Sequence, residues 1–294
     1  MRQTMKKFML ALLCATGSVH AAITVTDDAG NRITLAQPAQ RVISMAPHVT
    51  ELLFAAGGGK RIVGAINYSD FPAEAKSIPT IGSNSQIDME RVIALKPDLV
   101  IVWDSGTTAR QVQQLASLGV PIYRSEPRRF EQVATSMVRF GQLLGTDAVA
   151  ERAAANYRDE VARLKKRYGS QPVVPTFYQV WDRPIYTLNG NQIVSDAIGI
   201  CGGRNVFAAL PAVAPEVSVE AVLAQDPEAI VGDEPHGQQD PGIAIWKTYR
   251  AMTAVKRGNL FTVHGELLTR PGPRTVLGAA ELCEKLEQAR QRRR

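Results

Sequence analysis

Two ten-residue segments that lie 130 positions apart follow one pattern. Residues 88–97 (DMERVIALKP) and residues 218–227 (SVEAVLAQDP) each begin with a helix-capping residue, carry a glutamate two positions later and end in proline. Each segment then runs into an apolar stretch, DLVIVW in the first case and EAIVG in the second. This pattern predicts a short helix that leads into a buried strand. Because the unit occurs twice, the sequence predicts two similar lobes.

Strands and helices alternate along both halves of the chain. The polar stretch 23–40 is strand-like, and the apolar strand VISMA follows it before a helix over residues 47–56 that stops at three glycines. The strand IVGAI, the helix from Asp88, the strand DLVIVW and a helix after Gly106 continue the series. The strand VVPTFYQVW begins a second series, in which a helix over residues 192–201 follows. This alternation predicts an α/β fold with central parallel sheets.

A long, charged stretch without glycine separates the two series. It covers residues 147–168 and is closed by Gly-Ser-Gln-Pro, so we expect one long helix there. The chain is therefore predicted to form an N-terminal α/β lobe over residues 22–146, a linking helix over residues 147–168 and a C-terminal α/β lobe over residues 169–294.

Residues 1–21 have the features of a secretory signal peptide. A positively charged start precedes an apolar stretch at residues 8–15 and small residues, so we expect cleavage after Ala21. The apolar stretch is too short for a membrane-spanning helix. Lipidation at Cys14 is an alternative, but Leu13 stands where a small residue should precede a lipidated cysteine.

The positive charge of the chain lies at its two ends. Of the formal net charge of +6, the signal peptide contributes +3 and the basic tail at residues 290–294 contributes +4, which leaves −1 for residues 22–289. We expect the tail to be a solvated, frayed end. The export signal argues against a nucleic-acid-binding function, which the pI of 9.3 alone would suggest.

Cys201 and Cys283 are the two cysteines that remain after cleavage. Because exported proteins fold in an oxidising compartment, the pair predicts one disulfide. The alternative is two buried free thiols.

Motifs for catalysis are missing from the sequence. It contains no HExxH, no cysteine pair at metal-binding spacing, no GxSxG and no GxGxxG. The histidines after the signal peptide are His48, His236 and His264. We therefore expect no enzyme and no resident cofactor or metal, and a metal-dependent enzyme that uses His48 and His264 is the alternative.

Aromatic residues follow the predicted strands of both lobes. Trp103 ends DLVIVW, Tyr68 follows IVGAI, and Trp181 and Tyr186 follow FYQV. Open α/β sheets bind ligands at the carboxyl ends of their strands. These side chains, together with Arg270 after the strand NLFTV, predict a cleft for a large, flat ligand. The alternative is that some of them only pack the lobe faces.

Several segments, taken together, resemble the substrate-binding proteins of ABC importers that carry vitamin B12, haem or iron–siderophores. The resemblance extends over nearly all of the chain after the signal peptide, and the two cysteines resemble those of cobalamin-binding members. It implies two α/β lobes joined by one rigid helix, with the ligand cleft between them. The segments are RVISMAPHVTEL (41–52), YSDFP (68–72), ERVIALKPDLV (90–100), CGGRNVF (201–207) and RPGPR (270–274).

Glu90 and Glu220 occupy the first turn of the two repeated helices. There each would stabilise the helix dipole by about 0.3–1 kcal/mol, but this does not explain why both lobes keep glutamate at the same offset. The resemblance implies that the two glutamates dock with arginines on the two permease subunits.

The resemblance also implies that Tyr68, Trp103, Tyr186 and Arg270 face the ligand, and that Glu266 represents an acidic residue of the cleft. The sequence departs from cobalamin-binding members where these are richer in tryptophan. The corresponding positions here are Asn84 and Ala214.

We therefore expect a monomeric, non-catalytic periplasmic carrier that binds cobalamin or a related corrinoid and delivers it to an ABC permease. Haem or a ferric siderophore is the alternative ligand, with His48 as an axial ligand in the case of haem.

Overall fold

The computed structural model describes residues 22–234 and 242–293. The predicted signal peptide with Cys14 and the cleavage site, and also His236, lie outside the described residues. Within the described part of the chain, no helix is long and apolar enough to cross a membrane.

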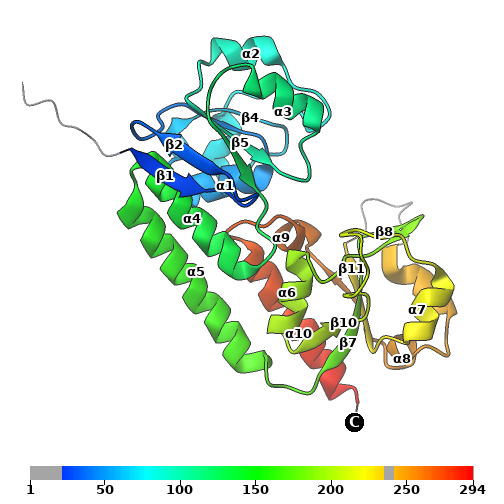
Figure 1. Cartoon of the computed structure of the whole chain (residues 1–294). Helices are drawn as coiled ribbons and strands as arrows, with labels where there is room; N and C mark the ends of the chain where they lie inside the picture. The colour runs from blue at the N-terminus through cyan, green and yellow to red at the C-terminus, as the bar shows by residue number, and fades with distance from the viewer. Residues whose placement is uncertain (1–21, 235–241, 294) are drawn as a thin grey trace, which may run out of the picture.

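Two four-stranded parallel sheets form the centres of two lobes (Figure 1). The strand order is β4-β3-β5-β6 in the N-terminal lobe and β10-β7-β11-β12 in the C-terminal lobe. In both sheets the strand that comes first in the chain (β3 or β7) lies second in the sheet, and the next strand in the chain (β4 or β10) lies at its edge. β5 (Leu99–Trp103) and β11 (Ala229–Asp233), which follow the repeated segments, hold the same place and start 130 positions apart. The two-lobe α/β prediction is confirmed.

The N-terminal lobe begins with an antiparallel hairpin, β1–β2, whose first strand contacts α4. The helices of this lobe are short, apart from α4, and each is followed by a strand or a turn. The elements are β1 (Ile23–Thr26), β2 (Arg32–Leu35), β3 (Val42–Ser44), α1 (Pro47–Ala55), the 3-10 helix η1 (Gly59–Arg61), β4 (Ile62–Ala65), η2 (Ala73–Ser77), α2 (Met89–Ala94), β5, α3 (Ala109–Ala116), β6 (Ile122–Ser125) and α4 (Phe130–Leu144).

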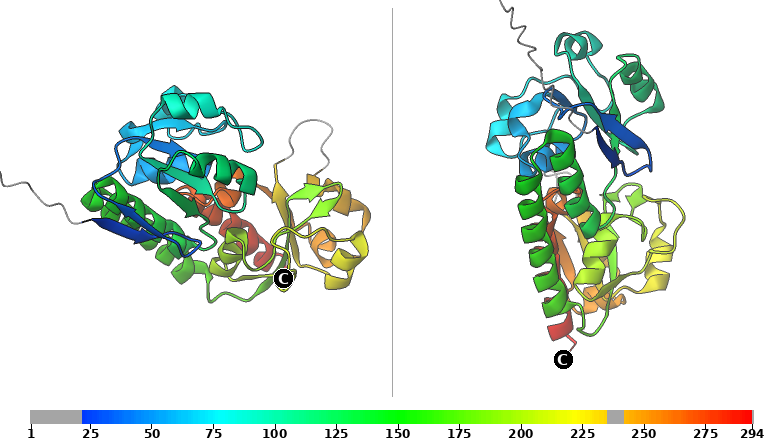
Figure 2. Two further views of the ribbon diagram at one scale, coloured as in Figure 1. Left: turned by 45° about the horizontal axis from the view of Figure 1, so that its top comes forward. Right: turned by 60° about the vertical axis from the view of Figure 1, so that its left-hand side comes forward.

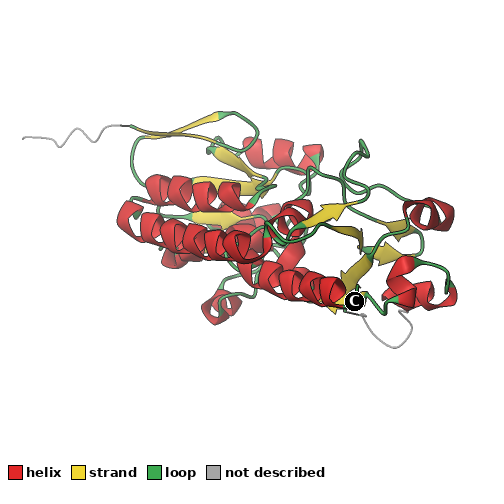
Figure 3. Cartoon of the chain, turned by 90° about the horizontal axis from the view of Figure 1, so that it is seen from below, coloured by secondary structure: helices red, strands yellow, loops and turns green. Residues whose placement is uncertain are grey.

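One long helix, α5 (Asp147–Tyr168), connects the lobes, and its bounds coincide with the predicted linking helix. An aspartate in its first turn and three cations in its last turn complement the helix dipole. Its buried face contacts α1 and α4 of the first lobe and α6 and α10 of the second. Figure 2 shows α5 running along the side of both lobes, and Figure 3 shows it beside α4.

The C-terminal lobe repeats the parallel sheet and adds a small antiparallel hairpin, β8–β9, after its first strand. The elements are β7 (Val174–Gln179), β8 (Trp181–Asp182), β9 (Ile185–Tyr186), α6 (Ile193–Ile200), β10 (Gly203–Asn205), α7 (Val219–Gln225), β11, η3 (Gly242–Thr248), α8 (Thr253–Lys256), β12 (Leu260–Val263), α9 (Gly265–Thr269) and α10 (Thr275–Gln291).

A single hydrophobic core extends through both lobes. It includes Leu52 of α1, Phe140 of α4, Tyr157 of α5 and Leu286 of α10, all buried. Two smaller cores lie one in each lobe. The two lobes are therefore packed on each other through α5 and are not independent of one another.

The predicted disulfide joins Cys201 to Cys283, with 4.6 Å between the two Cα atoms. It links the end of α6 to α10 and joins two residues that lie 82 positions apart in the chain. Both cysteines are fully buried, and the prediction is confirmed.

Residues 290–293 of the basic tail are not frayed, and for these residues the expectation was wrong. Arg290 is buried, and its guanidinium donates hydrogen bonds to the carbonyl of Cys201 (2.6 Å) and the carbonyl of Pro172 (2.8 Å). Arg293 donates to both carboxylate oxygens of Glu228, each at 2.6 Å. The helix α10 continues far enough to bring these cations onto carbonyl and carboxylate oxygens at the base of the C-terminal lobe.

Candidate functional site

Two ion pairs join the lobes at the carboxyl ends of their sheets. Glu51 lies in α1, directly after β3, and Asp70 lies in the segment after β4. Arg270 and Arg274 follow β12 and α9 in the other lobe. Arg274 Nη2 lies 2.6 Å from Glu51 Oε1, and Arg270 Nη1 lies 3.4 Å from Asp70 Oδ1. The carboxyl edges of the two sheets therefore face each other, and this is the edge at which open α/β sheets bind ligands.

The pair of Glu51 and Arg274 is the more firmly built of the two. Glu51 is only 3% exposed, and both its oxygens accept hydrogen bonds from Arg274, at 2.6 and 3.0 Å. These bonds raise the pKa of Arg274, whose guanidinium also lies 4.1 Å from the ring centre of Phe71. The sequence alone predicts no role for Glu51 or Arg274, because a contact between positions 223 residues apart leaves no local signal.

Tyr68 and Trp103 lie at the carboxyl edge of the N-terminal sheet, where they were predicted. Tyr68 is 75% exposed and has a φ of +65°, so the chain turns sharply there after β4. Tyr68 and Asp70 line a cavity of about 410 Å³. Trp103 is the last residue of β5, and its ring meets His48 edge to face at 6.0 Å. A side chain at Gly106 would collide with the Trp103 ring, so glycine permits this close approach.

Trp181 and Tyr186 are partners in the register of the β8–β9 hairpin, at the carboxyl end of β7. Trp181 is 53% exposed, and its indole N–H donates to the carbonyl of Arg183 at 3.2 Å. Tyr186 forms a β-bridge with Glu216. The hairpin was not predicted, yet it brings the two predicted aromatic residues side by side.

Arg270 lies between two carboxylates. Its guanidinium is 2.8 Å from Glu266 of α9, the helix that Arg270 follows, and 3.4 Å from Asp70 of the other lobe. The structure therefore brings together the predicted residues Arg270 and Glu266, and it adds Asp70. Asn84 and Ala214, which replace tryptophans of the cobalamin-binding members, are both exposed.

His48 and His264 have very different surroundings. His48 is 3% exposed, its Nε2 has no hydrogen-bond partner within the described residues, and burial lowers its pKa to about 3. His264 is exposed, and its Nδ1 lies 3.1 Å from Glu281, which raises the pKa of His264. Among residues 22–234 and 242–293, no cluster of three or more histidines, cysteines and carboxylates could hold a metal ion. The geometry gives no support to the metal-enzyme alternative.

Glu90 and Glu220 occupy equivalent positions on α2 and α7. Each helix is capped at its start: Asp88 accepts a hydrogen bond from the backbone N–H of Arg91, and Ser218 accepts one from Ala221. Both glutamates are exposed, and neither forms an ion pair with any residue that the structure describes. Hydrogen bonds from its own backbone N–H and from the Ser218 hydroxyl lower the pKa of Glu220. Both carboxylates are therefore open to a cationic partner.

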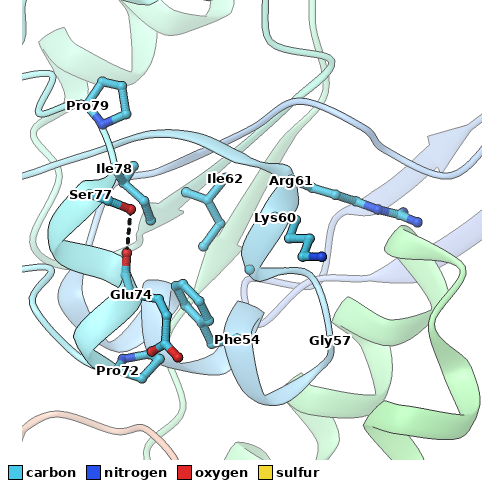
Figure 4. Close-up of a pocket in the computed structure, with 11 residues that line it drawn as sticks. Phe54, Gly57, Lys60, Arg61, Ile62, Pro72, Glu74, Ser77, Ile78 and Pro79 are labelled. Carbon is cyan, nitrogen blue, oxygen red and sulfur yellow. Dashed lines mark hydrogen bonds between the residues drawn. The ribbon is translucent and has the colours of Figure 1, made fainter.

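A larger cavity, of about 830 Å³, lies elsewhere on the N-terminal lobe, near the start of β4 (Figure 4). Its lining includes the apolar side chains of Phe54 and Ile62 and the charged side chains of Lys60 and Glu74. None of the predicted site residues lines it. It is separate from the facing carboxyl edges of the two sheets.

Comparison with known proteins gives consistent results. Residues 42–267 match the family model described as periplasmic binding protein. A vitamin B12-binding protein of Vibrio parahaemolyticus is 35% identical over 258 residues, which cover 87% of this chain and 93% of that protein. The crystal structure of the periplasmic vitamin B12 binding protein of Vibrio cholerae has a TM-score of 0.78 and 32% identity, covering 86% of this chain and 98% of that one.

A periplasmic haem binding protein of Pseudomonas aeruginosa is also similar, with a TM-score of 0.70 and 26% identity over 83% of this chain and 91% of that one. The family match extends over most of the described chain, and the relatives share its two-lobe fold. This chain belongs to the periplasmic binding protein family.

Proposed function

We propose that this protein binds cobalamin between its lobes in the periplasm and delivers it to the permease of an ABC importer. The observation that carries the proposal is the 35% identity, over nearly the full length of both chains, with a protein named for vitamin B12 binding. The facing carboxyl edges of the two sheets support it, because they offer a site with aromatic side chains from both lobes.

The aromatic residues suit the apolar faces of a corrin ring. Tyr68 and Trp103 come from one lobe, and Trp181 and Tyr186 come from the other. Each apolar contact with such a face removes apolar area from water, which contributes about 25 cal/mol per Å². Arg270 would donate hydrogen bonds to the polar groups at the rim of the ligand.

We expect a site that is largely formed before the ligand arrives. The helix α5 contacts both lobes, and the hydrogen-bonded pair of Glu51 and Arg274 joins them. A preformed site loses less conformational entropy on binding, so the affinity does not depend on a large closure.

Titration of the chain from residue 22 onward with cyanocobalamin, followed by absorbance and by calorimetry, tests the proposal. We expect one cobalamin per chain, and about tenfold weaker binding for Tyr68→Ala and for Trp181→Ala, which each remove an aromatic contact. Leu277→Ala, an equally exposed apolar residue on α10, is the control and should bind as the unmodified chain does. Failure to bind cobalamin, or unchanged affinity in both aromatic variants, would contradict the proposal.

Haem is the competing ligand, favoured by the similarity to a periplasmic haem binding protein. His48 would be its axial ligand, because burial keeps the imidazole neutral and its Nε2 has no partner among the described residues. Because His48 is only 3% exposed, haem ligation requires neighbouring side chains to move. A parallel titration with haemin separates the two ligands, since ligation by His48 would shift the haem absorbance and the shift would be lost in His48→Ala.

The remaining expectations belong to the same proposal. The carrier acts as a monomer after removal of residues 1–21, with cleavage after Ala21, and has no resident cofactor. Glu90 on one lobe and Glu220 on the other meet arginines of the two permease subunits.

A further inference from the structure

Two exposed aliphatic residues accompany the two glutamates. Ile93 on α2 is 58% exposed and Leu223 on α7 is 37% exposed. Each follows its glutamate by three positions, and the two are 130 positions apart, as the glutamates are. Nine large hydrophobic residues are exposed within the described part of the chain, and these two alone are related by the repeat.

The fold does not need apolar side chains at these positions. The neighbouring residues Val92 and Val222 are fully buried and already pack α2 and α7 against their lobes. An isolated exposed leucine or isoleucine is ordinary on a protein surface. Here, however, both lobes carry an exposed aliphatic residue at the same position, beside a carboxylate that forms no ion pair with the described residues. We therefore look for one role that both residues share.

Each glutamate and its aliphatic neighbour lie on one face of a helix. Residues three apart in a helix are adjacent on its surface, so Glu90 lies beside Ile93 and Glu220 beside Leu223. Both helices lie on the side of their lobe away from α5 (Figure 1). Each surface therefore combines one negative charge with one apolar side chain.

The two helices are held firmly. Each starts with a side-chain cap, and a residue with positive φ follows the end of each helix within two positions, Lys96 at +46° and Asp226 at +39°. A proline and a buried strand follow in both lobes. A contact surface that is already ordered loses little entropy when a partner binds.

We propose that Ile93 and Leu223 each insert into an apolar depression beside the arginine of a permease subunit, so that one charge and one apolar contact form the docking unit of each lobe. The proposal rests on the proposed function. The two related lobes fit a permease made of two equivalent subunits, and the exposed carboxylates fit a cation there. In such an interface the charge mainly raises the association rate, and the buried apolar side chain slows dissociation.

The test measures association and dissociation of the chain from residue 22 onward on the permease held in lipid nanodiscs. The double variant Ile93→Ala/Leu223→Ala should dissociate about tenfold faster or more, with the same ratio at low and high salt, because apolar contacts are not screened. Glu90→Lys/Glu220→Lys should instead slow association, with an effect that shrinks as salt is raised. Leu277→Ala is the matched control, and calorimetry should give unchanged cobalamin binding in all of these variants.

The outcomes separate this inference from the proposed function. If the double aliphatic variant dissociates as Leu277→Ala does, while the charge variant fails to dock, the inference is wrong and the proposed docking through glutamates stands. If the charge variant also docks normally, the inference and the proposed docking through Glu90 and Glu220 are both wrong. If the unmodified chain is a dimer that the aliphatic substitutions dissociate, the surface joins two copies of the chain and the inference is overturned.

Discussion

The positions of some arginines were predicted correctly from the sequence, and those of others were not. Arg270 was expected at the ligand site, and it does lie at the facing edges of the sheets, held by Glu266 and Asp70. The tail arginines were expected in solvent, but Arg290 lies buried beside the disulfide. Nothing local distinguishes a frayed basic tail from one that binds carbonyls, because the difference depends on where α10 ends against the lobe.

Arg290 should be important for stability. Arg290→Ala leaves the carbonyl of buried Cys201 and the carbonyl of Pro172 without this donor, so we expect a loss of roughly 2–3 kcal/mol in the free energy of unfolding. Thermal unfolding should begin about 5 °C or more lower. Arg163→Ala, on the exposed face of α5, is the control and should change stability by less than about 0.5 kcal/mol. Equal melting temperatures for the two variants would contradict this role of Arg290.

At the scale of elements, the repeat was the most informative part of the sequence. It predicted α2 and α7, the strands after them and the equivalence of the two lobes, because cap, charge, apolar spacing and proline act locally. The linking helix was predicted over its full length for the same reason. The β8–β9 hairpin was not predicted, because its strands are two residues long and are set by pairing and not by a pattern.

The helices α2 and α7 should act as one docking device. Glu90→Lys/Glu220→Lys places like charges against the proposed arginines, so we expect transport of cobalamin to be lost while ligand affinity is unchanged. Uptake of labelled cobalamin by cells or vesicles and calorimetry measure the two effects. Glu151→Lys/Asp159→Lys on α5 makes the same change in net charge at exposed positions and should leave transport intact. Loss of ligand binding in the α2–α7 variant would exclude this role.

At the scale of the whole molecule, the two lobes are one packed body. The sequence predicted two sheets and one connecting helix, but it could not predict that a common core joins the lobes, nor that Arg270 pairs with Asp70 and Arg274 with Glu51. Those contacts bring together positions about 200 residues apart, and their partners are set by the angle at which α5 positions the lobes. The facing of the two carboxyl edges follows from the same geometry.

The pair of Glu51 and Arg274 should set the spacing of the lobes. Glu51→Gln and Arg274→Gln should each lower the free energy of unfolding by about 1–3 kcal/mol, and the double variant should lose less than the sum. We also expect faster release of cobalamin and a larger radius of gyration by X-ray scattering. Asp70→Asn breaks the longer, more exposed pair and serves as the comparison, with smaller effects. Additive losses and unchanged dimensions would show that the pair does not hold the lobes.

The continuous core has a consequence for how the rate of uptake depends on the ratio of carrier to permease. If this core fixes the distance between α2 and α7, we infer that the carrier without ligand presents the same docking surface to the permease as the carrier with ligand. Carriers without ligand and carriers with ligand would then compete for the same docking sites on the permease. At low cobalamin concentration, the rate of uptake would then fall when the carrier greatly outnumbers the permease. Measuring the rate of uptake at different ratios of carrier to permease tests this expectation. The useful number of carriers per transporter would thus have an upper limit set by the stiffness of a single helix and the core around it.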